Sequence, residues 1–456
     1  MDFAEELRLF RERCNSTTFA GLVIPGTLQA TTAALLIGAL EPQRVAFLLT
    51  PDSQKMPDDV ARKLGFDSAP QNWQRYDEDH TDPLQIYRSL RKIIEAWNDL
   101  PRERLAVDVT GGTKPMSIGL AKAAYVLNLP ALYVESEYVS TGDGTERKVP
   151  RPGSQYLAPP PDPYIVFGDL EAAEATRLYE AHDYANAARI FADLGRRVPP
   201  PDGPRYAALA TLAAAYSAWD AFDLKTGRAS LEEFLSSVPE ERELVATIAI
   251  QAQTLERLEQ VARQAASRGN EALATLANPD AVLALLGSLY ASAKRREAQG
   301  RYDTAALLLY RCLELISQHR LATWGVLSER PDFTAAQERK PNLENRYEDV
   351  QRAQGRRRPY RLPDRAVGLF VGYMLLAALD DPLVRGYDIG RIEARSDARN
   401  TSILAHGYRL ITRDEYRQFA EVVEELLVRL LVLLGHDRAA WERASRFVDL
   451  PRLAMR

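Results

Sequence analysis

Short apolar runs alternate with helical patterns along the first third of the chain. The apolar runs of strand length are residues 19–24, 44–49, 105–109 and 131–134. The helical patterns are residues 1–14, 31–40, 84–100 and 116–127. Strand, turn, helix and strand make a βαβ unit, and strands that are apolar throughout are typical of a parallel sheet covered on both faces. Residues 1–148 are therefore predicted to form an α/β, Rossmann-like domain.

The pattern changes after residue 148. Prolines crowd residues 149–163, and because proline removes a backbone donor and stiffens the chain, we interpret this stretch as a linker without secondary structure. Beyond it we find helical periodicity and no convincing strand. The helical patterns are residues 170–181, 184–196, 206–223, 240–268, 281–297, 302–324, 362–379 and 413–434. The fold is therefore predicted to be α/β plus all-α, with a helical middle region at 164–300 and a helical C-terminal domain at 301–456.

A polar and basic run interrupts the helical part at residues 325–365. Its cations are Arg339, Lys340, Arg346, Arg352, Arg356, Arg357, Arg358 and Arg361. Such a run is usually a solvated loop, which is the interpretation we favour. The alternative is a rim that follows the phosphates of a nucleic acid.

Composition narrows the class of protein. A chain of 456 residues is long enough for two or three domains. Its net charge of −5 argues against a broad basic face for duplex nucleic acid, but not against a small basic groove. Cys14 and Cys312 have no metal or redox spacing and the first residues lack the pattern of a signal peptide, so a cytoplasmic location is expected. The longest apolar run, 366–379, is typical of a buried helix and not of a membrane span.

A glycine turn follows the third apolar run. Residues 107–117 read Val-Asp-Val-Thr-Gly-Gly-Thr-Lys-Pro-Met-Ser, and the next helix is predicted to begin at Pro115 or Met116. Ligands bind at the carboxyl ends of the strands in open α/β sheets, and backbone donors, a helix N-terminus and a lysine favour an anion there. The glycine spacing fits neither a Walker A loop nor the dinucleotide fingerprint. A phosphate-containing ligand is therefore predicted, with a purely structural turn as the alternative. The candidate binding residues are Thr110, Gly111, Gly112, Thr113 and Lys114.

Two further loops are expected on the same edge of the sheet, because each follows a predicted parallel strand. Their hydroxyl and amide groups are of the kind that reads ribose hydroxyls and adenine edges. The candidate residues are Gly26, Thr27, Gln29, Thr50, Asp52 and Ser53.

A second candidate site lies at residues 399–407, Arg-Asn-Thr-Ser-Ile-Leu-Ala-His-Gly. We expect 399–406 to be helical, which places Arg399 and His406 within about 20° of one face. Histidine exchanges a proton near neutral pH and arginine grips phosphate, so the pair is sufficient to break an RNA strand without a metal. The alternative is a commonplace pair with no chemical role. The candidate catalytic residues are Arg399, Asn400, Ser402 and His406.

The two motifs together resemble a known family. The pattern Asp-x-Thr-Gly-Gly-Thr-Lys-x-Met at 108–116 is similar to CARF domains of CRISPR-associated proteins, and the Arg399…His406 motif resembles that of HEPN ribonucleases. The order CARF, helical insert, HEPN is similar to the ancillary ribonucleases of type III CRISPR systems. The resemblance implies a homodimer with no cofactor or metal. It also implies activation by a cyclic oligoadenylate from the type III effector complex, and we expect cyclic tetraadenylate over hexaadenylate.

The resemblance also implies a mechanism. His406 would act as general base or acid and Arg399 would stabilise charge on the phosphoryl oxygens, while Asn400 and Ser402 orient the histidine or hold the phosphate. One alternative is a ligand-sensing regulator without nuclease activity, which the basic residues at 352–361 support. Another is a metal-dependent DNA nuclease, which would need carboxylates and a lysine on strands that the C-terminal half is not predicted to contain.

Overall fold

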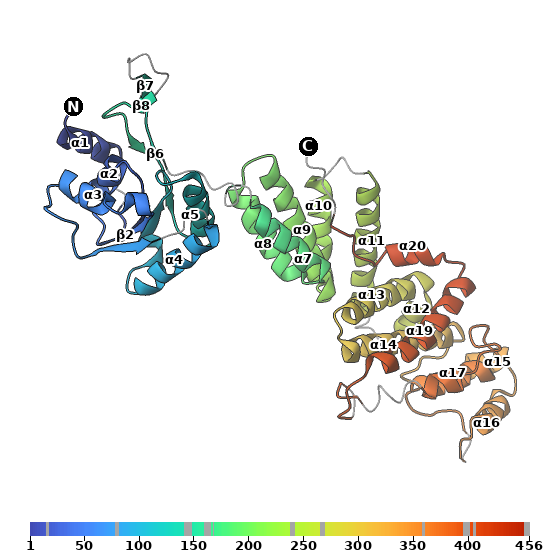
Figure 1. Cartoon of the computed structure of the whole chain (residues 1–456). Helices are drawn as coiled ribbons and strands as arrows, with labels where there is room; N and C mark the ends of the chain where they lie inside the picture. The colour runs from blue at the N-terminus through green and yellow to red at the C-terminus, as the bar shows by residue number, and fades with distance from the viewer. Residues whose placement is uncertain are drawn as a thin grey trace. The chain divides into compact units, whose positions relative to one another are not determined.

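A computed structural model gives the fold of the chain (Figure 1). It describes residues 1–14, 18–77, 82–140, 148–158, 166, 168–237, 242–264, 270–357, 361–394, 402–404 and 407–450. The chain divides into two compact units, residues 1–165 and 166–456.

A parallel sheet of five strands forms the centre of the N-terminal unit, in the order β3–β2–β1–β4–β5. The strands are β1 (Gly21–Pro25), β2 (Arg44–Leu49), β3 (Trp73–Asp77), β4 (Leu105–Asp108) and β5 (Ala131–Leu132). Gly21 of β1 is in register with Arg44 of β2 and with Leu105 of β4, so β1 is the central strand. The predicted parallel α/β domain is confirmed.

Helices cover both faces of this sheet. One face carries α1 (Phe3–Arg13), α2 (Thr31–Leu40) and α3 (Met56–Lys63), and the other carries α4 (Pro83–Ala96) and α5 (Lys114–Val126). Leu22 and Ile24 pack with the first group, whereas Val23 between them packs with the second. Side chains alternate between the faces of a strand, and here both faces are buried, which explains the uninterrupted apolar runs in the sequence.

Parts of this unit differ from the prediction. β3 and α3 are not among the predicted elements. β3 is an edge strand on which only Trp73 is buried, so it has no apolar run. α3 is short, and half of its eight residues are charged. Residues 149–158 are not a linker without structure. Instead, β8 (Lys148–Pro150) pairs with β7 (Tyr138–Ser140), and β9 (Tyr156–Leu157) pairs with β6 (Val134–Glu135). Both are two-stranded sheets, in which every strand is an edge and can accommodate proline.

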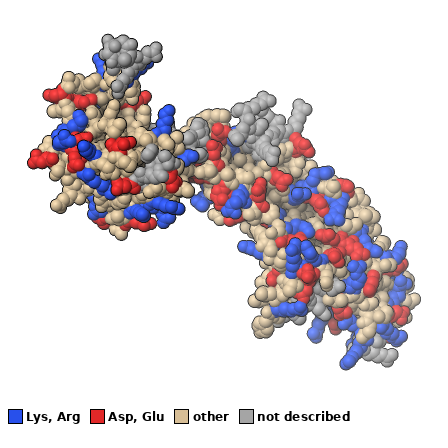
Figure 2. Space-filling view, viewed as in Figure 1, with Lys and Arg blue, Asp and Glu red and all other residues tan. Residues whose placement is uncertain are grey.

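The described part of the C-terminal unit is helical, which confirms the predicted all-α character. Its longer helices are α7 (Asp169–Glu180), α8 (Tyr184–Arg197), α9 (Asp202–Asp220), α10 (Leu224–Ser237), α11 (Arg242–Gln264), α13 (Pro279–Ala298), α14 (Tyr302–Thr323), α16 (Leu343–Ala353), α17 (Leu369–Ala378) and α19 (Arg413–Leu433). Its shorter ones are α12 (Asn270–Ala277), α15 (Thr334–Arg339) and α20 (Arg438–Arg443). Acidic and basic side chains interleave over the visible face of this unit (Figure 2).

The basic run 325–365 is not a solvated loop throughout. It contains α15 and α16, and Leu343 and Tyr347 of α16 are buried in a core shared with α14 and α17. The apolar positions are sparse and the charges many, so the run lacks the strong periodicity that would predict helices.

Two apolar cores fill the C-terminal unit. One lies among α7 to α11, and the other among α13, α14, α16, α17 and α19. The segment after α20 returns to the first core, where the ring of Phe447 stacks on Tyr216 with centroids 4.1 Å apart. The guanidinium carbon of Arg295 lies 3.9 Å from the Phe447 ring centroid. The N–H of Val448 donates to the Tyr216 hydroxyl at 3.2 Å. Phe447 therefore packs the segment after α20 against helix α9, which lies more than 200 residues earlier in the chain.

No single described helix is both long enough and apolar enough to cross a membrane. One bent pair, α12 with α13, reaches the required length and apolar character when the two are taken together, with an angle of 72° between them.

Candidate functional sites

Three loops share the carboxyl edge of the parallel sheet. They follow β1, β2 and β4, which are neighbours in the sheet order. The chain crosses from one side of β1 to the other between β3 and β4, so the switch in strand order lies between β1 and β4. Ligands of open α/β sheets bind in the crevice at such a switch. The loops at 26–29 and 110–114 flank this crevice.

The loop after β4 is held by its own side chains. Asp108 is buried, and its carboxylate accepts the Thr110 N–H at 2.8 Å. The Thr110 hydroxyl in turn accepts the Val134 N–H at 2.8 Å, and the Ser117 hydroxyl donates to the Gly111 carbonyl at 2.7 Å. Burial raises the pKa of Asp108 to about 6. This network fixes the turn before any ligand binds.

Glycine is required at one position of this turn. Gly112 has φ +80°, and a Cβ there would lie 2.9 Å from the Cβ of Pro25. The turn leads into α5, whose N-cap residue Thr113 makes no side-chain capping bond. The first N–H groups of a helix lack partners within it, and Lys114 is exposed beside them. The start of α5 and Lys114, for which no ion pair is formed within the described residues, therefore meet where the sequence predicts an anion.

The loop after β1 touches the loop after β4. A Cβ on Gly111 would lie 3.4 Å from the Thr27 Cγ2 atom. Gly26 is confined, because its N–H donates to the Leu48 carbonyl at 2.6 Å and a Cβ would lie 2.2 Å from the Ser53 hydroxyl. Thr27 is half-buried and Gln29 is exposed, so both remain available at the crevice.

The loop after β2 presents fewer groups than its sequence suggests. Thr50 and Ser53 are buried, and they form a capping box around the short 3₁₀ helix Pro51–Ser53. The Ser53 hydroxyl accepts the Thr50 N–H at 2.9 Å and lies 3.0 Å from the Thr50 hydroxyl. Asp52 is exposed. The structure thus brings the loops after β1 and β4 together. In the loop after β2, the hydroxyls of Thr50 and Ser53 point into the protein.

Sequence reasoning did not count Asp108 among the site residues. The signal was present, because an Asp two residues before a Thr-Gly turn accepts the N–H that such a turn leaves free. Asp108 acts through Thr110 and positions the loop.

The C-terminal candidate residues are only partly described. Arg399, Asn400 and His406 lie outside the described residues. Ser402 is buried, with 1% of its surface exposed, and forms an isolated bridge with Arg409. The Ile403 N–H donates to the Arg409 carbonyl at 2.9 Å.

The expectation of a helix over 399–406 is wrong at residues 402–404. The backbone groups there are used by the bridge, and the Gly407 N–H donates to the Ser402 carbonyl at 3.1 Å. The next helix, α19, begins only after a capping box between Thr412 and Glu415. In a helix the Ile403 N–H would donate to the carbonyl four residues earlier, so its bond to the Arg409 carbonyl excludes a helix at this position.

Helix α14 holds the end of this segment. The Ile411 N–H donates to the Asp303 carboxylate at 3.0 Å. Arg409 forms an ion pair with Glu415, the residue that also caps α19. Among the described residues, no group of three or more His, Cys, Asp or Glu side chains is placed to hold a metal ion.

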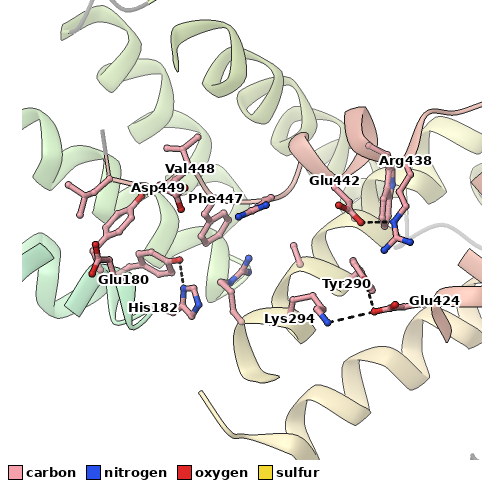
Figure 3. Close-up of a pocket in the computed structure, with 18 residues that line it drawn as sticks. Glu180, His182, Tyr290, Lys294, Glu424, Arg438, Glu442, Phe447, Val448 and Asp449 are labelled. Carbon is pink, nitrogen blue, oxygen red and sulfur yellow. Dashed lines mark hydrogen bonds and ion pairs between the residues drawn. The ribbon is translucent and has the colours of Figure 1, made fainter. Parts of the chain in front are cut away.

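A cavity of about 1050 Å³ lies where the two helical cores meet (Figure 3). On one side the Tyr290 hydroxyl donates to Glu424 at 2.9 Å, and Arg438 pairs with Glu442 at 2.8 Å. On the other side burial lowers the pKa of His182. Because these polar side chains of the cavity wall contact one another, we interpret the cavity as space left where the two cores meet.

Two family models match the C-terminal unit. The model described as the Csm6 6H domain matches residues 167–267, and the model described as the Csm6 HEPN domain matches residues 274–430. The second match contains the whole motif from Arg399 to His406. Together the two matches cover more than half of the chain.

Individual proteins agree with these matches. A CRISPR system endoribonuclease Csm6 from Thermus thermophilus is 31% identical over 315 residues, 68% of this chain. The chain spans 64% of the length of that relative. The structure of Enterococcus italicus Csm6 bound to cyclic hexa-2′-fluoro-hexa-dAMP aligns with 94% of this chain and 98% of its own, with a TM-score of 0.51 and 13% identity. At that identity the likeness concerns the fold.

Proposed function

We propose that this chain, which belongs to the Csm6 family, is an endoribonuclease that a cyclic oligoadenylate activates. The observation that carries the proposal is the position of the HEPN match, whose residues 274–430 include both Arg399 and His406. Since the chain spans 64% of the curated relative, the relative's activity is extended to this chain by proposal.

The proposed chemistry uses the nucleophile that RNA carries. The 2′-hydroxyl attacks the adjacent phosphorus and the bond to the 5′-oxygen breaks. His406 acts as general base or acid, and Arg399 stabilises the charge on the phosphoryl oxygens. The products are a 2′,3′-cyclic phosphate, which becomes a 3′-phosphate when water opens it, and a 5′-hydroxyl, formed without a divalent metal. Asn400 orients the histidine or holds the phosphate. Because its side chain is buried, we assign Ser402 to holding the segment.

The proposed activator site is the crevice between β1 and β4. Lys114 and the uncapped start of α5 would neutralise a phosphate, and Thr27 and Gln29 would contact ribose or adenine from the facing loop. Thr50 and Ser53 would shape the neighbouring loop, since their hydroxyls are engaged with each other. Cyclic tetraadenylate is still the expected ring size.

Cleavage of a single-stranded RNA by the purified chain, in EDTA and with cyclic tetra- or hexaadenylate, tests the function. We expect cleavage only when an activator is present, with cyclic phosphate ends in the products. Activator binding without cleavage would favour a ligand-sensing regulator instead. Cleavage that EDTA abolishes would favour a metal-dependent nuclease.

The proposed assembly is a homodimer that binds one activator on its two-fold axis. One chain offers half a ring of loop donors, and a ring with two-fold symmetry matches two such halves. Calorimetry should give one ligand for two chains, and sedimentation should give a dimer. A monomer that still cleaves RNA when activated would contradict this assembly.

A further inference from the structure

A second cavity of the C-terminal unit, of about 490 Å³, is lined by α14, α16, α17 and the turn after α16. Tyr310, Tyr347 and Phe370 line it with aromatic rings, and Gln351 and Arg357 add polar groups. The volume is in the range of sites that hold small ligands, roughly 300–1,000 Å³. None of these residues belongs to the activator loops or to the catalytic motif.

Described residues on either side of the catalytic motif are connected to helices that line the cavity. Glu393 lines the cavity and precedes Arg399 by six residues, which span at most about 20 Å. Beyond the motif, Ile411 donates to Asp303 at the start of α14. Asp303 and Tyr310 are seven residues apart on that helix, so they share a face and lie about 10 Å apart along it.

The aromatic wall is suited to a planar ligand. Tyr310 and Phe370 are half-buried, so part of each side chain stays accessible. The guanidinium carbon of Arg356 lies 4.9 Å from the Phe370 ring centroid, and Arg356 also pairs with Glu393. Bases of single-stranded RNA stack on aromatic rings and on guanidinium planes.

Gln351 adds a polar group that needs a partner. Its amide oxygen is buried and has no hydrogen-bond partner among the described residues. A buried acceptor without a donor is unfavourable. The terminal torsion of an amide is broad, so rotation can turn this oxygen toward the cavity, where a ligand N–H would satisfy it. Adenine, cytosine and guanine each present an exocyclic amino group that projects from the ring, whereas uracil has only a ring N3–H, which lies between two carbonyl oxygens that the Gln351 oxygen would repel.

Arg357 supplies a cation at the rim of the cavity. Its side chain is exposed, and within the described part of the chain it forms no ion pair. Arg356 beside it is instead engaged by Glu393. A cation at the rim of an aromatic pocket is placed to contact the phosphate of a nucleotide whose base lies inside.

We propose that this cavity is a subsite for one nucleotide of the RNA substrate. A base with an exocyclic amino group stacks against Tyr310 and donates to Gln351, and Arg357 contacts the attached phosphate. The subsite rests on the proposed RNA cleavage and adds to it a selection among bases near the cut.

The test compares activated cleavage of oligoadenylate and oligouridylate substrates by the full chain. Gln351→Leu should lower the ratio of kcat/KM for the adenine substrate over the uracil substrate by about 5- to 150-fold, the range for a lost base-edge contact. It should change kcat/KM for the uracil substrate little. Arg357→Ala should raise KM for both substrates.

Binding without cleavage gives a readout that does not depend on catalysis. Fluorescence anisotropy with labelled oligoadenylate, in the absence of activator, should show weaker binding by Arg357→Ala. The slope of log K against log salt should fall by about 0.7, the value for one phosphate contact on a single strand. Arg365→Ala is the matched control, since it removes an exposed arginine that lies three residues before Gly368 in the sequence and does not line the cavity.

Three outcomes would overturn the subsite. Gln351→Leu could slow cleavage of both substrates equally, which would mean a structural role. Both variants could behave like the wild type while the wild type cleaves RNA. Either variant could convert a dimer to a monomer, which would mean that a second chain occupies the cavity. A wild type that binds oligoadenylate in preference to oligouridylate but cleaves no RNA would contradict the proposed function and leave the subsite standing.

Discussion

The loop after β4 and the segment before α19 are fixed in different ways. In the loop, Asp108 accepts a hydrogen bond from Thr110, only two residues further on. In the segment, the Ile411 N–H donates to Asp303, which lies 108 residues earlier in the chain. A local motif therefore carries its own geometry, whereas the segment with the catalytic motif depends on the packing of α14.

This difference predicts which measurements each region should change. Substitutions in the loop should alter activator affinity and leave the chemistry intact once the activator saturates. Substitutions around the segment should alter turnover and leave activator affinity intact. Substitutions at His406, Arg399, Lys114 and Asp303 test this separation, and Asp108→Asn tests what holds the loop itself.

The largest effect is expected for His406→Ala. Loss of a general acid or base lowers turnover by about 10²–10⁴-fold, which would bring RNA cleavage to background, and Arg399→Ala should act similarly. Activator affinity, measured by calorimetry, should stay at the wild-type value. RNA cleavage that persists near the wild-type rate in either variant would remove the HEPN assignment of these residues.

Lys114→Ala should weaken activator binding by about 10- to 150-fold, as expected for a lost charge-assisted contact of about 1.5–3 kcal/mol. Turnover at saturating activator should be unchanged. Lys122→Ala is the control, because Lys122 is an exposed lysine on the same helix α5, two turns beyond its start. Equal affinity of Lys114→Ala and wild type would mean that the turn is structural.

Asp108→Asn should remove a pH dependence of stability. The folded pKa of Asp108 is about 6, above the ordinary value of 3.8, so the native state binds its proton more tightly than the unfolded state. Stability is then lost as pH rises from about 4 to 6. The free energy of unfolding of the wild type relative to Asp108→Asn should fall by about 2 kcal/mol between pH 4.5 and 7.5. A difference that stays constant with pH would show that Asp108 titrates normally.

The smallest effect is expected for Asp303→Ala. The Ile411 N–H would lose its acceptor, which costs about 1 kcal/mol, so turnover should fall by roughly 5-fold. Asp303→Asn keeps a side-chain oxygen and should restore most of the turnover. If Asp303→Ala lowers activator affinity and leaves turnover unchanged, the loop after β4 and the segment before α19 do not control affinity and turnover separately.

The sequence predicts the parts of this molecule that have local causes. β1, β2 and β4 are buried on both faces, so their apolar runs reveal them, and their shared edge follows from parallel pairing. β3 escapes prediction because an edge strand needs few apolar residues. The helices α15 and α16 escape it because charge outweighs their few buried positions.

The sites follow the same rule. The turn from Thr110 to Lys114 could be predicted from its glycines and from the helix that starts there. The burial of the Thr50 and Ser53 hydroxyls could not be predicted, because the same residues in an open loop would face solvent. Asp303 could not be predicted, since only the packing of α14 brings it to Ile411. Long-range contacts of this kind leave no pattern in a local stretch of sequence.

The anchoring of Phe447 has a practical consequence for work with fragments. A HEPN fragment cut at the start of its family match would keep Phe447 but lose Tyr216, and a fragment that ends at residue 430 would lose Phe447 itself. Either cut uncovers aromatic surface that is buried in the whole chain, and exposed patches of this kind promote aggregation. The region 168–450 should therefore be expressed as one piece, and insoluble truncations should not be taken as evidence about catalysis.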